Sequence, residues 1–119
     1  MSEFEISSAS KDAGDRQVKI LSLKGQLDAH TFPSLQEKLE SVVSDGSPRV
    51  VLDCEKLEYI SSAGLGVLKK MTREFRGLDG DIRLAQLPPK IDNVVNLLGF
   101  SQVIQVYKGL DEAVQSYKG

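Results

Sequence analysis

The central segment of the chain, residues 57–68, reads LEYISSAGLGVL and places two serines between two different apolar patterns. Before it, residues 50–54 form a continuous apolar run, which is typical of a strand buried on both faces. After it, apolar residues recur every three or four positions, which predicts a helix over about residues 62–76. The sequence therefore places Ser61 and Ser62 at or near the N-cap of that helix.

Alternating strands and helices are predicted on both sides of this segment. The chain opens with a predicted hairpin, formed by strands around residues 4–8 and 18–23 with a turn at residues 12–15. The remaining predicted elements are a helix capped by Thr31 and ending at Gly46, a strand over residues 82–87, a helix over residues 91–98, a short strand over residues 103–107 and a last helix over residues 110–117. This order predicts an α/β fold with a small mixed sheet, whose parallel strands are joined by right-handed crossovers.

The composition limits the classes of function. A chain of 119 residues suits one domain, and a formal net charge of -2 offers no strong field for nucleic acid or an anionic membrane. No long apolar segment or signal-peptide pattern is present, so we expect a cytoplasmic protein with no membrane contact. Cys54 and His30 are single residues of their types, which disfavours a disulfide or a zinc site. We expect no metal and no cofactor, and we expect Cys54 in the core.

Motifs along nearly the whole chain match one family. They are LKGQLD at residues 23–28 with Thr31, VLD at residues 51–53, Ser62 with Gly64 and Leu65, LLGF at residues 97–100, and DEAV at residues 111–114. Together they resemble the STAS domain of bacterial anti-sigma factor antagonists. The resemblance implies a single domain over residues 1–119 with a core of about residues 4–118. It also implies a mixed β-sheet of about four to five strands, with about four helices mainly on one face.

The resemblance implies a chemical role for the serine loop. In that family the serine that matches Ser62 is phosphorylated by a partner kinase that is also the anti-sigma factor. Two positions depart from the usual pattern, because Ser61 stands where the family has an aspartate and Ala63 stands where it has a hydroxyl. Ser61 is therefore a second candidate for phosphorylation.

A partner-binding surface around Ser62 follows from the same resemblance. The loop after Leu27 lies beside the serine loop in that family and contributes to the same surface. The candidate partner-binding residues are Asp28, His30, Ser61, Ser62, Gly64, Leu65, Gly66 and Lys69. No catalytic residue is expected, and Asp53 is expected to be structural, since no second carboxylate or phosphate-binding loop accompanies it.

These features favour an anti-sigma factor antagonist that is a binding protein and not an enzyme. When unphosphorylated, it would sequester an anti-sigma factor serine kinase of the histidine-kinase-like ATPase fold and so free a sigma factor. Phosphorylation of Ser62 would end the binding, and a metal-dependent serine phosphatase would restore the hydroxyl. The free protein is expected to be a monomer.

Three other interpretations remain open at the level of the sequence. Ser61 and Ser62 could serve only as helix caps, as serine does at many helix starts. Ser62 could be a nucleophile with His30 as its base, although no nucleophile elbow surrounds it. The domain could also be a STAS scaffold or accessory subunit of a transport or signalling complex, without a phosphorylation switch.

Overall fold

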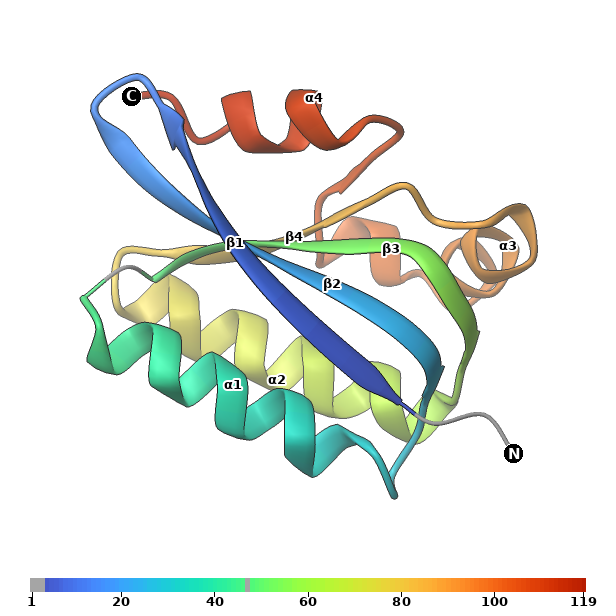
Figure 1. The fold of residues 1–119 in the computed structure, drawn as a ribbon. Helices are drawn as coiled ribbons and strands as arrows, with labels where there is room; N and C mark the ends of the chain where they lie inside the picture. The colour runs from blue at the N-terminus through green and yellow to red at the C-terminus, as the bar shows by residue number, and fades with distance from the viewer. Residues whose placement is uncertain (1–3, 47) are drawn as a thin grey trace.

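A five-stranded sheet runs through the computed structural model, which describes residues 4–46 and 48–119 (Figure 1). Its strands are β1 (Glu5–Ala13), β2 (Arg16–Leu27), β3 (Arg49–Ile60), β4 (Asp81–Ala85) and β5 (Val106–Tyr107). The helices are α1 (Phe32–Ser44), α2 (Ser62–Gly77), α3 (Pro89–Leu97) and α4 (Leu110–Gln115), with a 3₁₀ helix η1 (Phe100–Gln102). The predicted α/β class with a small mixed sheet is confirmed. The predicted domain start at residue 1 lies outside the described residues.

The strand order is β1-β2-β3-β4-β5, with β1 antiparallel to β2 and every later pair parallel. Each parallel connection therefore steps across the sheet in the same direction. Right-handed crossovers that step in one direction place their helices on one face. Helices α1 and α2 do lie together on one face of the sheet, whereas α4, which joins no two strands, covers the other face (Figure 1). The expectation of helices mainly on one face is confirmed, with α4 as the exception.

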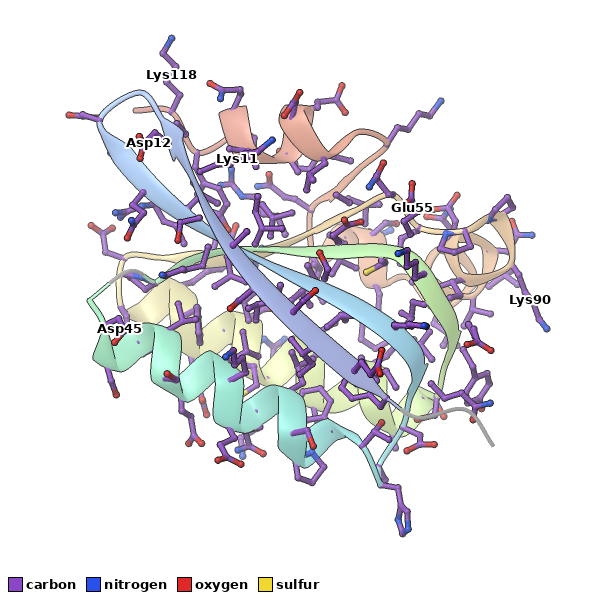
Figure 2. The ribbon with its side chains drawn as sticks, in the orientation of Figure 1. Lys11, Asp12, Asp45, Glu55, Lys90 and Lys118 are labelled. Carbon is purple, nitrogen blue, oxygen red and sulfur yellow. The ribbon has the colours of Figure 1, made fainter. Side chains whose placement is uncertain are left out.

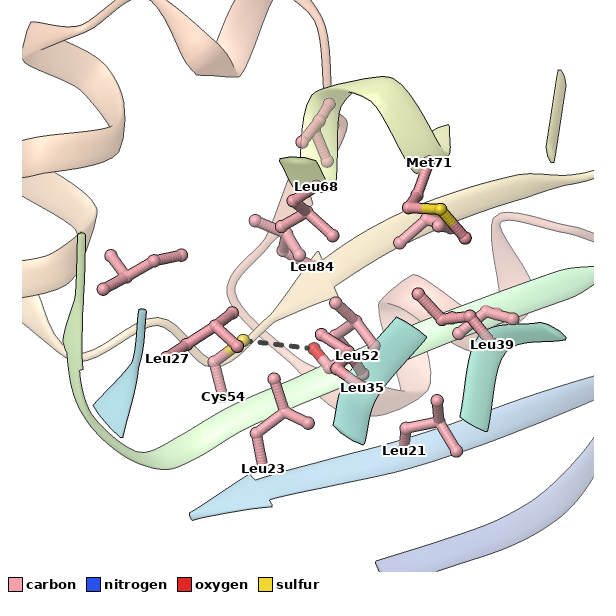
Figure 3. Close-up of a cluster of buried hydrophobic side chains, with 14 of the residues drawn as sticks. Leu21, Leu23, Leu27, Leu35, Leu39, Leu52, Cys54, Leu68, Met71 and Leu84 are labelled. Carbon is pink, nitrogen blue, oxygen red and sulfur yellow. Dashed lines mark hydrogen bonds between the residues drawn. The ribbon is translucent and has the colours of Figure 1, made fainter. Parts of the chain in front are cut away.

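The larger hydrophobic core fills the space between the sheet and helices α1 and α2 (Figure 3). Helix α3 contributes Ile91 and Val95 to it. Cys54 belongs to this core, as predicted, and its thiol donates a hydrogen bond to the Leu52 carbonyl oxygen at 3.5 Å. Burial raises the pKa of the Cys54 thiol to about 12. The thiol is therefore neutral and unreactive at physiological pH.

A smaller core lies under α4 on the opposite face. It contains Ala113 and Val114 of α4 together with Tyr117, packed on apolar residues of the first four strands. The Tyr117 hydroxyl donates to the Val50 carbonyl oxygen at 2.7 Å, and the Arg83 guanidinium lies 4.0 Å from the centre of the Tyr117 ring. These contacts stabilise the packing of the C-terminal segment on the sheet.

The strand boundaries differ from the sequence-based prediction: β1 and β2 are longer than predicted and β4 ends two residues earlier, while β3 and β5 differ most. Strand β3 continues to Ile60, six residues beyond the predicted end at Cys54, because β2 pairs with it as far as Leu27 and Ile60. Because this pairing contains two register shifts, apolar and polar residues do not alternate regularly along the end of β3, and the sequence pattern does not indicate a strand there. Strand β5 has only two residues, where five were predicted, because η1 precedes it and only Val106 and Tyr107 pair with β4.

The connection from α2 to β4 requires a glycine at position 80. A Cβ atom there would overlap the Pro48 carbonyl oxygen, because the chain passes directly over it and Asp81 donates its N–H to the same oxygen at 3.0 Å. Gly77, the last residue of α2, has no atom within 4 Å of the equivalent position. Gly80 therefore tests the overlap, and Gly77 serves as its control.

We expect Gly80→Ala to lower the free energy of unfolding by about 1–3 kcal/mol, because the overlapping backbone must move. Gly77→Ala should leave stability unchanged or raise it by a few tenths of a kcal/mol, roughly the helix preference of alanine over glycine. Urea unfolding of the two variants beside wild type measures both values. Equal losses in the two variants would contradict the assigned overlap.

Candidate functional site

Two loops emerge side by side where the parallel strands β2 and β3 end. Leu27 and Ile60 are register partners and are the last residues of their strands. The next residue after β3, Ser61, donates its backbone N–H to the Leu27 carbonyl oxygen at 2.9 Å. Parallel pairing therefore brings the loop that starts at Asp28 next to the serine loop, as the family resemblance implied.

Ser61 is the N-cap of α2. Its backbone is extended, with φ -85° and ψ 161°, and its Oγ accepts the Gly64 N–H at 2.9 Å. Its carbonyl oxygen accepts the Leu65 N–H, which is the first hydrogen bond of the helix. Ser61 is half-buried, and its hydroxyl oxygen already accepts one of the free N–H groups at the start of the helix.

Ser62 is the first residue of α2 and is exposed. Within residues 4–46 and 48–119 its hydroxyl makes no hydrogen bond. The first turn of this 16-residue helix carries no acidic side chain, so its free N–H groups and its positive dipole end face solvent beside Ser62. Of the two candidate acceptors, Ser62 is the accessible one.

The two glycines of the loop have different roles. Gly64 is buried, and a Cβ atom there would lie 3.0 Å from the Leu27 carbonyl oxygen and 3.3 Å from the Ser61 Oγ. Its missing side chain lets the start of α2 approach the end of β2 closely. Gly66 is exposed with no atom within 4 Å of an added Cβ, so it leaves a bare stretch of helix surface.

The predicted partner-binding residues on α2 divide between surface and core. Ser62, Gly66 and Lys69 follow one another at four- and three-residue intervals, so they share one side of the helix, and Lys69 is half-buried. Leu65 has 0% of its surface exposed and packs in the larger core. The expectation that Leu65 offers its side chain to a partner is therefore corrected.

Asp28 organises the neighbouring loop. Its Oδ1 accepts the backbone N–H groups of His30 at 2.9 Å and Thr31 at 3.0 Å. These bonds, that of Thr31 foremost, lower the pKa of the Asp28 carboxyl below its ordinary value. Thr31 stands at the N-cap position of α1 but makes no capping bond, contrary to the prediction, because its Oγ1 accepts the Asp28 backbone N–H at 3.0 Å while its O–H donates to the Gln26 carbonyl oxygen at 2.7 Å.

His30 is exposed at the tip of this loop, and in the described part of the chain no hydrogen bond joins its ring to the Ser62 hydroxyl. Asp53 lies in the middle of β3, away from the strand end where it was predicted. Its Oδ1 accepts from the Gln86 side-chain amide at 2.9 Å and from the Glu55 N–H at 3.2 Å.

Tyr59 is a surface residue that the sequence analysis missed. It is 48% exposed, pairs with Gln26 across β2 and β3, and lies two residues before Ser61. Aromatic residues are enriched in protein-binding surfaces relative to the rest of a protein surface. In the sequence, Tyr59 stands between an acidic and an apolar residue, as in an alternating strand. It was missed because the predicted strand ended at residue 54.

Comparison with known proteins assigns the fold to a family. The STAS domain model matches residues 11–113. The chain belongs to the STAS domain family. BtrV of Bordetella bronchiseptica, named as an anti-sigma factor antagonist, is 32% identical over 99 residues, which are 83% of this chain and 85% of BtrV.

Solved structures agree with this assignment. An anti-sigma factor antagonist from Mycobacterium paratuberculosis is 26% identical with a TM-score of 0.76, covering 94% of this chain and 93% of that chain. The phosphorylated form of SpoIIAA, a Bacillus cell fate determinant, is 19% identical with a TM-score of 0.66, covering 94% of this chain and 100% of that chain. The second likeness concerns the fold alone.

A similar fold also occurs within a transporter. The murine anion transporter Slc26a9 matches with 21% identity and a TM-score of 0.71 over 89% of this chain but 18% of the transporter, which again concerns the fold alone. Among the described residues, no helix has both the length and the apolar composition needed to cross a bilayer.

We expect Ser61→Ala to lower the free energy of unfolding by about 1 kcal/mol, because the Gly64 N–H loses its acceptor. Ser62→Ala, one residue away, should change stability by less than about 0.5 kcal/mol, because its hydroxyl makes no bond to lose. Urea unfolding of both variants tests this division. A larger loss in Ser62→Ala would show that the caps are assigned to the wrong serine.

The lowered pKa of Asp28 predicts a stability difference that depends on pH. The charged carboxylate stabilises the folded state above the unfolded pKa, and this contribution is lost as the pH falls through the lower folded pKa. Asp28→Asn should therefore be less stable than wild type at about pH 7, and the difference should shrink below about pH 4. Chemical unfolding at the two pH values measures it, and a difference independent of pH would contradict the assignment.

Proposed function

We propose that this protein is an anti-sigma factor antagonist that is switched by phosphorylation of Ser62. The observation that carries the proposal is the exposed Ser62 at the first position of a long helix, whose hydroxyl makes no hydrogen bond to any residue that the structure describes. The names of its relatives support the same role, since BtrV and the mycobacterial protein are both described as anti-sigma factor antagonists.

The unphosphorylated protein binds its partner through the surface around Ser62. This surface combines Ser62, Gly66 and Lys69 of α2 with His30 of the neighbouring loop and Tyr59 at the end of β3. The neutral hydroxyl and the bare Gly66 surface let another chain approach the start of the helix closely. The proposed partner is an anti-sigma factor serine kinase of the histidine-kinase-like ATPase fold, whose capture frees a sigma factor.

Phosphorylation changes the surface without unfolding the helix. The partner kinase transfers the terminal phosphoryl group of ATP to the Ser62 Oγ, the hydroxyl proton is lost and ADP leaves. A phosphate of about -1.5 to -2 charge units then lies at the positive end of α2, where free N–H groups favour it. The cost falls on the complex, because the partner site fits a neutral hydroxyl.

The size of this effect suits a switch. Leaving a buried charge unpaired in an interface costs about 2–5 kcal/mol, which is a loss of affinity of roughly thirtyfold to several thousandfold. One phosphate is therefore enough to release the partner. A metal-dependent serine phosphatase then hydrolyses the ester and restores the hydroxyl.

Ser61 is the weaker acceptor in this proposal. Its Oγ accepts the Gly64 N–H and is half-buried, so a kinase must first open the N-cap to reach it. Gly64, although it was predicted to contact the partner, acts by bringing the helix start against Leu27. Asp28 likewise acts by shaping the loop that carries His30.

The test is a binding and phosphorylation experiment with matched variants. The partner is captured from the source cell with wild-type protein, and its affinity for wild type, Ser62→Ala, Ser62→Glu and Ser61→Ala is measured by calorimetry. Ser62→Glu should bind at least about thirtyfold more weakly, while Ser62→Ala and Ser61→Ala bind like wild type. With ATP and magnesium, mass spectrometry should place the phosphate on Ser62 in wild type and find none in Ser62→Ala.

Ser41→Glu is the control for added charge, because Ser41 is an exposed serine on α1 outside the proposed surface. It should bind the partner like wild type. Equal affinities for Ser62→Ala and Ser62→Glu would contradict the switch and favour a scaffold without phosphorylation. A phosphate on Ser61 alone would assign the switch to the wrong serine.

A further inference from the structure

Strand β1 forms an edge of the sheet that no other strand of the described residues covers. It is nine residues long and pairs with β2 in nine consecutive register pairs without a shift (Figure 1). Natural edge strands are usually short, bulged, interrupted by proline or charged, which prevents pairing with other chains. Strand β1 is long, regular and free of proline, and its charged residues Glu5, Lys11 and Asp12 lie toward its two ends, so the middle of its outer edge is a regular template for another strand.

The side chains of β1 alternate between the two faces of the sheet. Lys11 lies on the side of the sheet that α4 covers (Figure 2), and its Nζ is 3.3 Å from the Oδ1 of Asp111 in α4. Glu5 shares this face, because residues an even number of positions apart in a strand point the same way. Ile6, Ser8 and Ser10 lie on the other face. The middle of the strand, residues 7–10, consists only of serine and alanine, so no bulky side chain blocks the edge.

Geometry restricts how such a strand can pair with a second copy of itself. In an antiparallel pair, two residues that face each other either both form the hydrogen bonds of the pair or both do not. Along one regular strand this property alternates from residue to residue. In the self-pairing of two identical strands, an odd-numbered residue can therefore face only an odd-numbered residue, and an even-numbered one only an even-numbered one.

We propose that β1 pairs antiparallel with β1 of a second copy of this chain, with Ser8 facing Ser8 and Glu5 facing Lys11 at both ends. This is the only allowed register in which opposite charges of the two strands meet. The remaining charge of β1, Asp12, shares its face with no other charged residue of the strand. The two-fold pairing joins two sheets into one and is self-complementary.

Existing contacts do not prevent this pairing. Glu5 lies 3.9 Å from Lys24 and Lys11 lies 3.3 Å from Asp111, and all four side chains are more than half exposed. Such surface ion pairs are weak and can be shared with a further charge. Because a single strand edge buries little surface, the dimer is weak. The free protein, predicted to be a monomer, would then be in equilibrium with a dimer at high concentration.

A charge swap tests the proposal with this protein alone. Sedimentation equilibrium over rising concentrations should show a dimer for wild type. Glu5→Lys or Lys11→Glu should raise its dissociation constant at least about tenfold, because each places two like-charged pairs across the interface. The double variant should restore dimerisation. Asp12→Lys is the control and should dimerise like wild type, and circular dichroism checks that every variant is folded.

A cysteine pair tests the register. Residues facing each other in antiparallel strands have Cα atoms about 4.5–5.5 Å apart, which a disulfide can span. Ser8→Cys should therefore form a disulfide-linked dimer under mild oxidation, whereas Ser10→Cys, which faces Ile6 in this register, should not. The native Cys54 is buried and does not compete. Absence of a dimer, a dimer insensitive to the charges, or equal cross-linking of the two cysteines would overturn the proposal.

Discussion

The candidate site depends on the parallel pairing of β2 with β3, which runs from Lys19 and Val50 to the ends of both strands. This pairing ends at Leu27 and Ile60, and the hydrogen bond from Ser61 to the Leu27 carbonyl oxygen at 2.9 Å continues it by one residue into the loop. The start of α2 is thereby fixed against the end of β2, and Gly64 supplies the close approach. Without this pairing, the serine loop and the Asp28 loop would be two unrelated surface turns.

The two serines divide two tasks that a single residue could not perform together. The Ser61 Oγ satisfies the Gly64 N–H and so stabilises the start of the helix in every state of the protein. Because Ser61 provides the cap, the Ser62 hydroxyl can be modified without loss of that hydrogen bond. A capping serine would have to give up its hydrogen bond whenever it accepted a phosphate. The neighbouring cap therefore makes the switch compatible with a stable fold.

The sequence predicted the order of elements and the start of α2 within one residue, because long apolar stripes and serine caps are local features. It missed the length of β3, since two shifts of register and the exposed pair Glu55 and Lys56 disguise the strand. The helical period of the apolar residues correctly placed Leu65 on the buried stripe of α2, whereas its assignment to the partner surface rested on the family resemblance. The hydrogen bonds of the Asp28 carboxylate depend on the three-dimensional path of its loop. The exposure of Tyr59 depends on how the end of β3 is covered, and neither can be read from the sequence pattern.

The absence of a carboxylate at position 61 changes the electrostatics of the switch. An aspartate there would place a negative charge beside Ser62 and partly neutralise the positive end of α2 before any modification. With neutral Ser61 as the cap and no acidic residue in the first turn, the helix end keeps its full positive character. A phosphate on Ser62 would then meet no carboxylate at position 61 or in the first turn of α2. In the proposed switch, the added charge would consequently be tolerated by the protein itself, and its destabilising effect would fall on the complex with the partner.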